Sequence, residues 1–286
     1  MIRDHPATAA SSDSAPHWQC AGCAVEFPPG AKPTGQCPIC ADERQYIPGG
    51  TQRWVSTEEL VAAGRDLEFT TLEPGLTAVT APEVGIGQSG LLLETAAGSL
   101  LFDVPGIITD EAVRRISERG PLRAIVASHP HMYGVQQQYS QALGDPPIYV
   151  ARKDAGWVQY SSNAVVEWDE PFEVLPGVWL HQVGGHFPGS TVALWPAGAG
   201  GRGVLLAGDA IFPVADGNVT FLRSYPNRIP LSAAVVRRLA AKVGELEFDR
   251  LYNNFSSVVP RDAHRIVQFS AERYARWVGG HFDHLT

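Results

Sequence analysis

The chain has 286 residues, of which 44% are hydrophobic and 18% are charged, and its formal net charge is -8. This composition excludes a disordered, collagenous or fibrous protein and allows one sizeable globular core with a small additional module. The acidic balance gives no electrostatic reason to bind a nucleic-acid backbone or an anionic membrane, so we expect a small-molecule substrate as partner. No apolar run approaches the roughly 18 residues of a spanning helix, and residues 1–17 lack the apolar centre of a secretory signal. A soluble, cytoplasmic protein is therefore expected.

The composition changes along the chain and predicts three segments. Residues 1–17 are rich in alanine and serine, and we expect them to be disordered because they bury too little apolar surface. Residues 18–50 hold all the cysteines, and residues 51–286 carry the alternating strand and helix patterns of one long domain.

The four cysteines are grouped as two Cys-x-x-Cys pairs separated by a loop rich in proline and glycine: Cys20, Cys23, Cys37 and Cys40. Four thiolates in such pairs can complete a tetrahedral metal site, and a segment with so few apolar residues would need the metal to fold. The spacing predicts one structural zinc ion in a zinc ribbon. A rubredoxin-like iron centre, a redox dithiol and a disulfide pair formed under oxidising conditions are the alternatives.

Hydrophobic periodicity predicts the elements that follow. A short helix is expected over Ser56 to Ala63, where Ser56 and Glu59 can form a capping box, and a charged helix over Asp110 to Glu118. Two helices near the end of the chain are indicated by apolar stripes, namely Leu231, Val235, Leu239 and Val243, then Val267, Ala271, Tyr274 and Val278. Strands are predicted at two places within Gly90 to Val104, and at Leu122 to Ser128, Ile148 to Arg152, Val178 to Val183, Thr191 to Trp195 and Gly203 to Ala207. Alternating strands and helices place the domain in the layered α/β class.

Potential metal ligands follow several of these strands. His129 and His131 come directly after a buried strand, with Pro130 between them to bend the chain. His186 lies in a glycine-rich loop between two strands, and Asp209 follows another apolar strand. Each residue alone has an ordinary structural explanation, but four such residues at strand ends form the kind of ligand set that catalytic metal sites use.

The order His-x-His after a strand, then Gly-His, then strand-Gly-Asp resembles the metallo-β-lactamase fold superfamily over about Thr70 to the C-terminus. The resemblance implies a four-layer αββα sandwich with metal bound at one edge between its sheets, here preceded by a small four-cysteine zinc ribbon. It assigns His129, His131 and His186 to the first metal site, and Asp209 to the aspartate that bridges two metals. The whole layout, with CPICADERQY, SHPHMY, GGHFPGST and RSYPNRIPL, is similar to a metallo-hydrolase-like branch of the superfamily.

The sequence also departs from the superfamily pattern His-x-His-x-Asp-His. The run continues from His131 as Met132, Tyr133 and Gly134, so both second-metal ligands of this loop are missing. The family also has a histidine late in the chain, expected here after FDRLYNN, and this sequence has Phe255, Ser256 or Ser257 in its place. The resemblance therefore implies one catalytic ion, zinc or iron, held by three imidazoles and one carboxylate.

Other polar residues are candidates for substrate contacts. Tyr133 stands where the family keeps an aspartate that orients water, so its phenol is a candidate catalytic donor. The alternative is a stacked aromatic that lines the cleft. Arg223, Tyr225 and Asn227 lie in a proline-bounded loop soon after Asp209 and are candidates for substrate binding, unless the loop is a structural turn.

Three functions are compatible with these residues. A single-ion metallohydrolase that activates water against an ester, thioester, lactone or amide-type carbonyl is the first. A non-haem iron oxygenase or redox enzyme on the same fold is the second, because imidazole and carboxylate ligands also suit iron. A non-catalytic member that binds a ligand or partner, with the zinc ribbon mediating association into a homo-oligomer, is the third.

Overall fold

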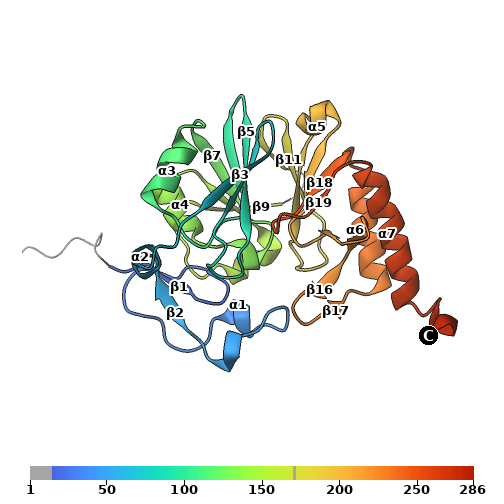
Figure 1. Cartoon of the computed structure of the whole chain (residues 1–286), viewed down its shortest axis with the longest axis horizontal. Coiled ribbons are helices and arrows are strands. Elements are labelled where there is room, and N and C mark those ends of the chain that lie inside the picture. Colours follow the sequence, from blue (N-terminus) through green and yellow to red (C-terminus); the bar gives the residue numbers. More distant parts are fainter. Residues whose placement is uncertain (1–14, 170–171) are drawn as a thin grey trace, which may run out of the picture.

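Two β-sheets lie face to face in the middle of the molecule, with helices on the outer side of each (Figure 1). The structure is a computed structural model that describes residues 15–169 and 172–286. The predicted disorder of residues 1–17 falls mainly on residues 1–14, which lie outside the described residues. No helix among the described residues is both long enough and apolar enough to cross a membrane.

The first sheet has seven strands in the order β3-β4-β5-β6-β7-β8-β9. Neighbours from β3 to β6 are antiparallel, whereas β6 to β9 are parallel. The strands are β3 (Glu68–Glu73), β4 (Leu76–Thr80), β5 (Ser89–Thr95), β6 (Gly98–Phe102), β7 (Leu122–Val126), β8 (Ile148–Ala151) and β9 (Val165–Trp168).

The second sheet has six strands in the order β10-β11-β12-β13-β18-β19, antiparallel except for the pair β13 and β18. They are β10 (Phe172–Leu175), β11 (Val178–Gln182), β12 (Thr191–Trp195), β13 (Val204–Leu206), β18 (Arg250–Tyr252) and β19 (Val258–Val259). Two short hairpins, β14 (Phe212–Pro213) with β15 (Val219–Thr220) and β16 (Leu222–Ser224) with β17 (Ile229–Pro230), follow β13.

Alternating side chains of the central strands fill the spaces between four layers. In β5, Leu91 and Leu93 pack between the two sheets, whereas Leu92 packs on the opposite face of the first sheet, because successive side chains of a strand point to opposite sides. The helices α3 (Asp110–Ser117) and α4 (Gln136–Ala142) contribute to the core on that face, and α6 (Ala233–Val243) and α7 (Ala263–Val278) cover the second sheet. The architecture is therefore the expected αββα sandwich.

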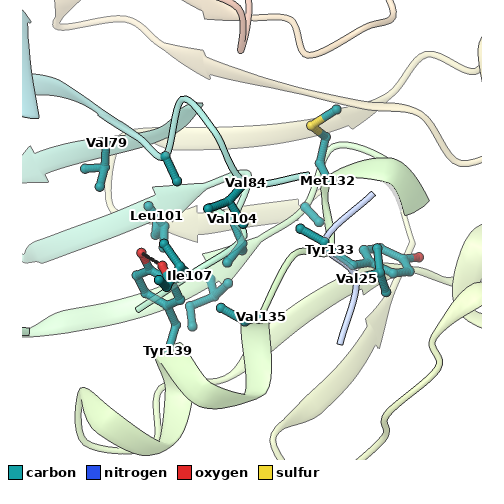
Figure 2. Packing of buried hydrophobic residues seen from close by; sticks show 14 of the residues in the cluster. Val25, Val79, Val84, Leu101, Val104, Ile107, Met132, Tyr133, Val135 and Tyr139 are labelled. Atoms are coloured by element: carbon teal, nitrogen blue, oxygen red, sulfur yellow. Dashed lines mark hydrogen bonds between the residues drawn. The ribbon is translucent and has the colours of Figure 1, made fainter. Parts of the chain in front are cut away.

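The cysteine-rich segment packs against the first sheet and its helices. Its strand β1 (Trp18–Cys20) pairs with β2 (Trp54–Ser56), and α1 (Pro38–Ala41) carries the last cysteine. Figure 2 shows Val25 of this segment among the buried side chains of the first-sheet core. The domain backbone reaches it closely at Gly106, where a Cβ would lie 2.4 Å from the Cβ of Ala24. The segment therefore shares its core with the large domain.

The helices and strands predicted by periodicity are present within one or two residues of their expected ends, except that α7 begins at Ala263, four residues before its predicted stripe. The short helix α2 (Thr57–Ala62) has the predicted capping box between Ser56 and Glu59. Two details of the helix stripes are wrong. Leu231 precedes α6, whose first cap is Ser232, although it is buried in the same core, and Val278 of α7 is exposed. The 3-10 turns Pro48–Gly50, Pro130–Met132, Arg152–Trp157 and Asp283–Leu285, and the turn α5 (Gly198–Gly201), have no counterpart in the predicted pattern.

Candidate metal centre

The four predicted ligands converge at one edge of the two sheets. His129 and His131 follow β7, His186 lies in the loop between β11 and β12, and Asp209 follows β13. One ligand atom from each lies within 4.8 Å of the others, and all four residues are buried. The two loops that carry them touch at Gly208, where a Cβ would lie 2.4 Å from Ser128 Oγ and where φ is +49°. Glycine is needed there on both grounds.

The spacing of the ligand atoms suits a single ion. His131 Nδ1 and His186 Nε2 are 3.2 Å apart, and His129 Nε2 and Asp209 Oδ2 are 3.6 Å apart. Ligand atoms of a tetrahedral zinc site with nitrogen and oxygen ligands are separated by about 3.3 Å. Nε2 of His129, one of these ligand atoms, is buried with no hydrogen-bond partner among the described residues. A buried polar atom without a partner is costly, so a cation beside it fits the site.

Neighbouring groups fix how two of the imidazoles face. Nδ1 of His186 lies 3.1 Å from the carbonyl oxygen of Leu222. When a neutral His186 donates its Nδ1 proton to this oxygen, Nε2 carries no proton and is left as an acceptor. Nδ1 of His129 is 2.9 Å from Ser128 Oγ. The Ser128 amide in turn donates to Asp103 Oδ1 over 2.6 Å. These contacts hold the metal-binding nitrogens toward the centre of the cluster.

Burial shifts the acid-base properties of the cluster. It lowers the pKa of His186 to about 4 and that of His129 and His131 well below the usual value, because burial disfavours the imidazolium form. Burial, and to a lesser extent the charge of Asp103, raises the pKa of Asp209 to about 8. Neutral imidazoles are the form that binds a metal ion, and a cation would favour the ionised carboxylate.

The cysteines form the second candidate site. All four are buried and free, with Sγ atoms of Cys20 and Cys40 separated by 3.6 Å and those of Cys23 and Cys37 by 3.7 Å. A tetrahedral zinc ion with thiolate ligands requires about 3.8 Å between sulfurs. Gln52 Nε2 and the Gly22 amide donate to Cys20 Sγ, over 3.2 Å and 3.4 Å. Such donors stabilise a thiolate, so the donor set fits the predicted structural metal.

A cavity of about 610 Å³ opens onto the histidine cluster. His131, His186 and Asp209 form its floor, and Phe212, Tyr225 and Phe255 form an aromatic side. The cysteine-rich segment supplies much of the remaining wall, through Ala21, Gly22, Arg44, Gln45, Tyr46, Pro48 and Arg53. A volume of this size suits a small molecule.

The structure resembles solved metallo-β-lactamases. VMB-1 matches with a TM-score of 0.56 at 16% identity, covering 74% of this chain and 99% of that chain. FIM-1 from Pseudomonas aeruginosa, in its mono-zinc form, matches with a TM-score of 0.52 at 18% identity, covering 73% of this chain and 96% of its own. No protein-family model matches the chain. Among curated proteins, the uncharacterized protein YmaE of Bacillus subtilis (strain 168) is 38% identical over 273 residues, covering 94% of this chain and 99% of YmaE.

The chain belongs to one family with YmaE, and its fold is that of the metallo-β-lactamases. The structure explains why its His-x-His motif is not followed by the further ligands of the superfamily pattern. Gly134 has a φ of +50°, and a Cβ there would lie 2.4 Å from the carbonyl oxygen of Val104. A histidine at this position has no room for its side chain. Phe255, one of the three residues expected to replace the late family histidine, lines the cavity.

Tyr133 lies in the core, away from the cavity lining. Its hydroxyl donates to the carbonyl oxygen of Asp154 over 3.0 Å, and its ring is buried among the side chains shown in Figure 2. Burial raises the pKa of Tyr133 far above its usual value. The alternative of an aromatic that lines the cleft is therefore wrong, because Tyr133 packs in the core and does not line the cavity. A catalytic role for Tyr133 stays a prediction.

The three candidate substrate-binding residues occupy different places. Tyr225 lines the cavity and donates from its hydroxyl to the carbonyl oxygen of Asp209 over 2.8 Å. Arg223 Nε donates to Glu43 over 2.6 Å, and Asn227 Nδ2 donates to the carbonyl oxygens of Glu43 and Gln45. The latter two therefore hold the cysteine-rich segment against the site, and substrate contact by any of the three stays a prediction.

Two residues that the sequence patterns do not single out support the site. Arg44 Nε donates to the carbonyl oxygen of His186 over 2.9 Å, and its guanidinium lies over the Phe187 ring at 4.2 Å. Asp103, just after β6, accepts the hydrogen bond from the Ser128 amide. The signal for Asp103, an acidic residue directly after an apolar strand, is the same as for Asp209. Nothing local in the sequence distinguishes Arg44.

Proposed function

We propose that the chain is a metal-dependent hydrolase whose single-ion site of three histidines and one aspartate activates water against an ester, thioester, lactone or amide-type carbonyl. The observation that supports it is the opening of the cluster of His131, His186 and Asp209 onto a cavity of about 610 Å³. When bound, a metal ion there would lower the pKa of a coordinated water toward 7 and polarise a carbonyl.

The number of ions follows from the donors available. Among the described residues, the groups able to hold a metal are the cysteine set and the histidine set, each with four members. The second-metal positions of the superfamily are replaced by Tyr133, Gly134 and a residue of 255–257, of which Tyr133 is buried in the core and Gly134 has no space for a side chain. A second ion would have Asp209 as its only ligand from the motif, so we infer a single catalytic ion. The set of three histidines favours zinc over iron as that ion.

The chain's own groups prepare the site for this chemistry. The bond from His186 Nδ1 to Leu222 leaves Nε2 facing the cavity, and Asp103 orders the loop that carries His129 through Ser128. The aromatic side chains of Phe212 and Phe255 limit water beside the reacting carbonyl. An apolar wall next to ordered ligands is the usual arrangement of small-molecule sites.

Metal content per chain and hydrolysis test the proposal together. Wild type, His129→Ala/His131→Ala, Cys37→Ser and the exposed control His281→Ala are purified as full chains and analysed for zinc and iron. Each is then assayed with p-nitrophenyl acetate and an acetyl thioester. We expect two ions in wild type and in His281→Ala, the loss of one ion in each of the other variants, and loss of hydrolysis in the double histidine variant.

Two results would contradict the proposal. A double histidine variant that keeps both ions or wild-type hydrolysis would remove the cluster from catalysis. Iron at the histidine site, with oxygen uptake in place of hydrolysis, would replace the hydrolase by the redox alternative.

A further inference from the structure

A second cavity of about 610 Å³ lies on the other side of the loop that carries His186. Gly184 and Gly185, which precede His186, line it, and Arg44 lines both this cavity and the one over the metal cluster. Five basic side chains and no acidic ones are among its described lining residues: Arg44, Lys153, Arg223, Arg238 and Lys242. We refer to it as the basic cavity.

The charge of this cavity is opposite to that of the protein. The chain has 30 acidic against 22 basic residues, so an average concave surface would contain more acidic than basic side chains. Clefts lined by one sign of charge concentrate field lines and attract ligands of the opposite sign. The basic cavity is therefore a local exception that favours an anion.

The basic side chains differ in how far their charge is already balanced. Arg44 pairs with Asp42 over 2.7 Å, and Arg223 pairs with Glu43 over 2.6 Å. Lys242 donates to the carbonyl oxygen of Gln182 over 2.6 Å.

Lys153 and Arg238 have no ion pair with any described residue. Lys153 lies in the 3-10 turn Arg152–Trp157 after the first sheet's β8, and Arg238 lies on α6, which covers the second sheet. Two unpaired cations thus reach the basic cavity from opposite halves of the sandwich.

The remaining lining is largely apolar. Val183, Pro188, Leu231 and Val235 contribute hydrophobic surface next to the basic groups. A bare inorganic anion would leave this surface without a partner, whereas an organic molecule with a charged group would use both parts. The volume is within the range of small-molecule sites and too small for a nucleic-acid helix or a protein.

We propose that the basic cavity is a binding site for a phosphorylated small organic molecule, for which a diphosphate serves as the probe. Its charged group contacts Lys153 and Arg238 together, and its organic part packs against Val183, Leu231 and Val235. Phosphate oxygens and basic side chains form charge-assisted hydrogen bonds, which are roughly twice as strong as neutral ones. The site is distinct from the metal cluster and does not depend on hydrolysis by it.

Isothermal titration of the full chain with inorganic pyrophosphate and with n-butyl diphosphate tests the site. We expect Lys153→Gln/Arg238→Gln to weaken the binding of both probes about tenfold or more. Arg237→Gln is the matched control, because Arg237 is adjacent on α6 but pairs with Glu272 and does not line the cavity. This control variant should bind both probes within about twofold of wild type.

Diphosphates also bind metal ions, so metal content is measured before and after each titration. Equal affinities of wild type and Lys153→Gln/Arg238→Gln would place the probes at a metal or elsewhere and overturn the proposal. So would the absence of binding by wild type at millimolar probe. Tighter binding of n-butyl diphosphate than of pyrophosphate supports the apolar part of the site, and equal binding refutes that part.

Discussion

The buried carboxyl of Glu26 gives the protein a pH-dependent stability that one substitution should remove. Glu26 follows the first cysteine pair and is 3% exposed. Its Oε1 accepts from the Gln137 amide over 2.5 Å, and Oε2 accepts from Gln138 Nε2 over 3.4 Å, so it joins the cysteine-rich segment to α4. Burial raises the pKa of Glu26 from 4.5 to about 8, and these hydrogen bonds offset only part of the rise.

The sign and size of the effect follow from linkage between protonation and folding. Because the pKa of Glu26 is higher in the folded protein than in the unfolded chain, Glu26 takes up a proton on folding between these two pKa values. The free energy of unfolding is therefore highest below pH 4.5 and falls as the pH rises to about 8. At 1.36 kcal/mol per pKa unit, the interval from pH 5 to pH 8 corresponds to about 4 kcal/mol. This is an upper limit, because buried sites relax when they ionise. Glu26→Gln keeps the neutral form at every pH and should abolish this loss.

Urea unfolding followed by tryptophan fluorescence at pH 5 and at pH 8.5 measures the difference. The free energy of unfolding of Glu26→Gln relative to wild type should increase by several kcal/mol, up to about 4, between these values. Glu245→Gln, at an exposed position, should show no such change. Parallel pH curves for wild type and Glu26→Gln would refute the reasoning, since other titrating groups act equally on both proteins.

Two further substitutions test the contacts between segments and the support of the metal centre. Gly106→Ala should lower the free energy of unfolding by about 1–3 kcal/mol, since its Cβ would lie 2.4 Å from that of Ala24. Gly156→Ala, whose Cβ would meet no described atom within 4 Å, should change it by less than about 0.5 kcal/mol, and equal urea midpoints for the two would contradict the close contact. Asp103→Ala should weaken zinc binding about 10- to 100-fold in chelator competition, because it removes the acceptor of the Ser128 amide. Asp103→Asn keeps a hydrogen-bond acceptor, and asparagine tolerates the φ of 64° at this position. If Asp103→Asn weakens zinc binding as much as Asp103→Ala does, the weakening is caused by the lost charge alone and not by the lost acceptor.

The fold can be predicted where local patterns and packing agree. The strand β12 has the ends that the sequence predicts, because Thr191 followed by four apolar residues fits a strand buried on both faces. The helix α4 is not predicted, because its first residues, Gln136, Gln137 and Gln138, are polar yet buried, so no apolar stripe marks it. Glu26 of the cysteine-rich segment accepts hydrogen bonds from Gln137 and Gln138, and the local sequence around α4 does not predict this contact.

The candidate metal ligands can be predicted from the sequence for a related reason. His129 and His131 come soon after β7 of the first sheet, and Asp209 comes soon after β13 of the second sheet. These strand ends meet at the same edge of the sandwich, and a strand end is a rigid place for a ligand. The wall of the cavity cannot be predicted in this way, because Arg44 is held there by a hydrogen bond to His186, which is 142 positions away in the sequence. This contact depends on how the cysteine-rich segment packs against the large domain. Neither the cysteine motif nor the histidine motif specifies that packing.

That packing joins the two candidate metal sites physically. Cys40, in α1, is followed within four residues by Arg44, whose guanidinium holds the His186 carbonyl and whose own carbonyl accepts from Ser224 Oγ over 3.0 Å. A cysteine site that fixes α1 therefore also fixes one wall of the cavity and one support of a histidine ligand. The cysteine-rich segment is therefore part of the architecture of the candidate site. A metal ion held by its four cysteines would support that site by fixing the position of α1, without entering the cavity itself.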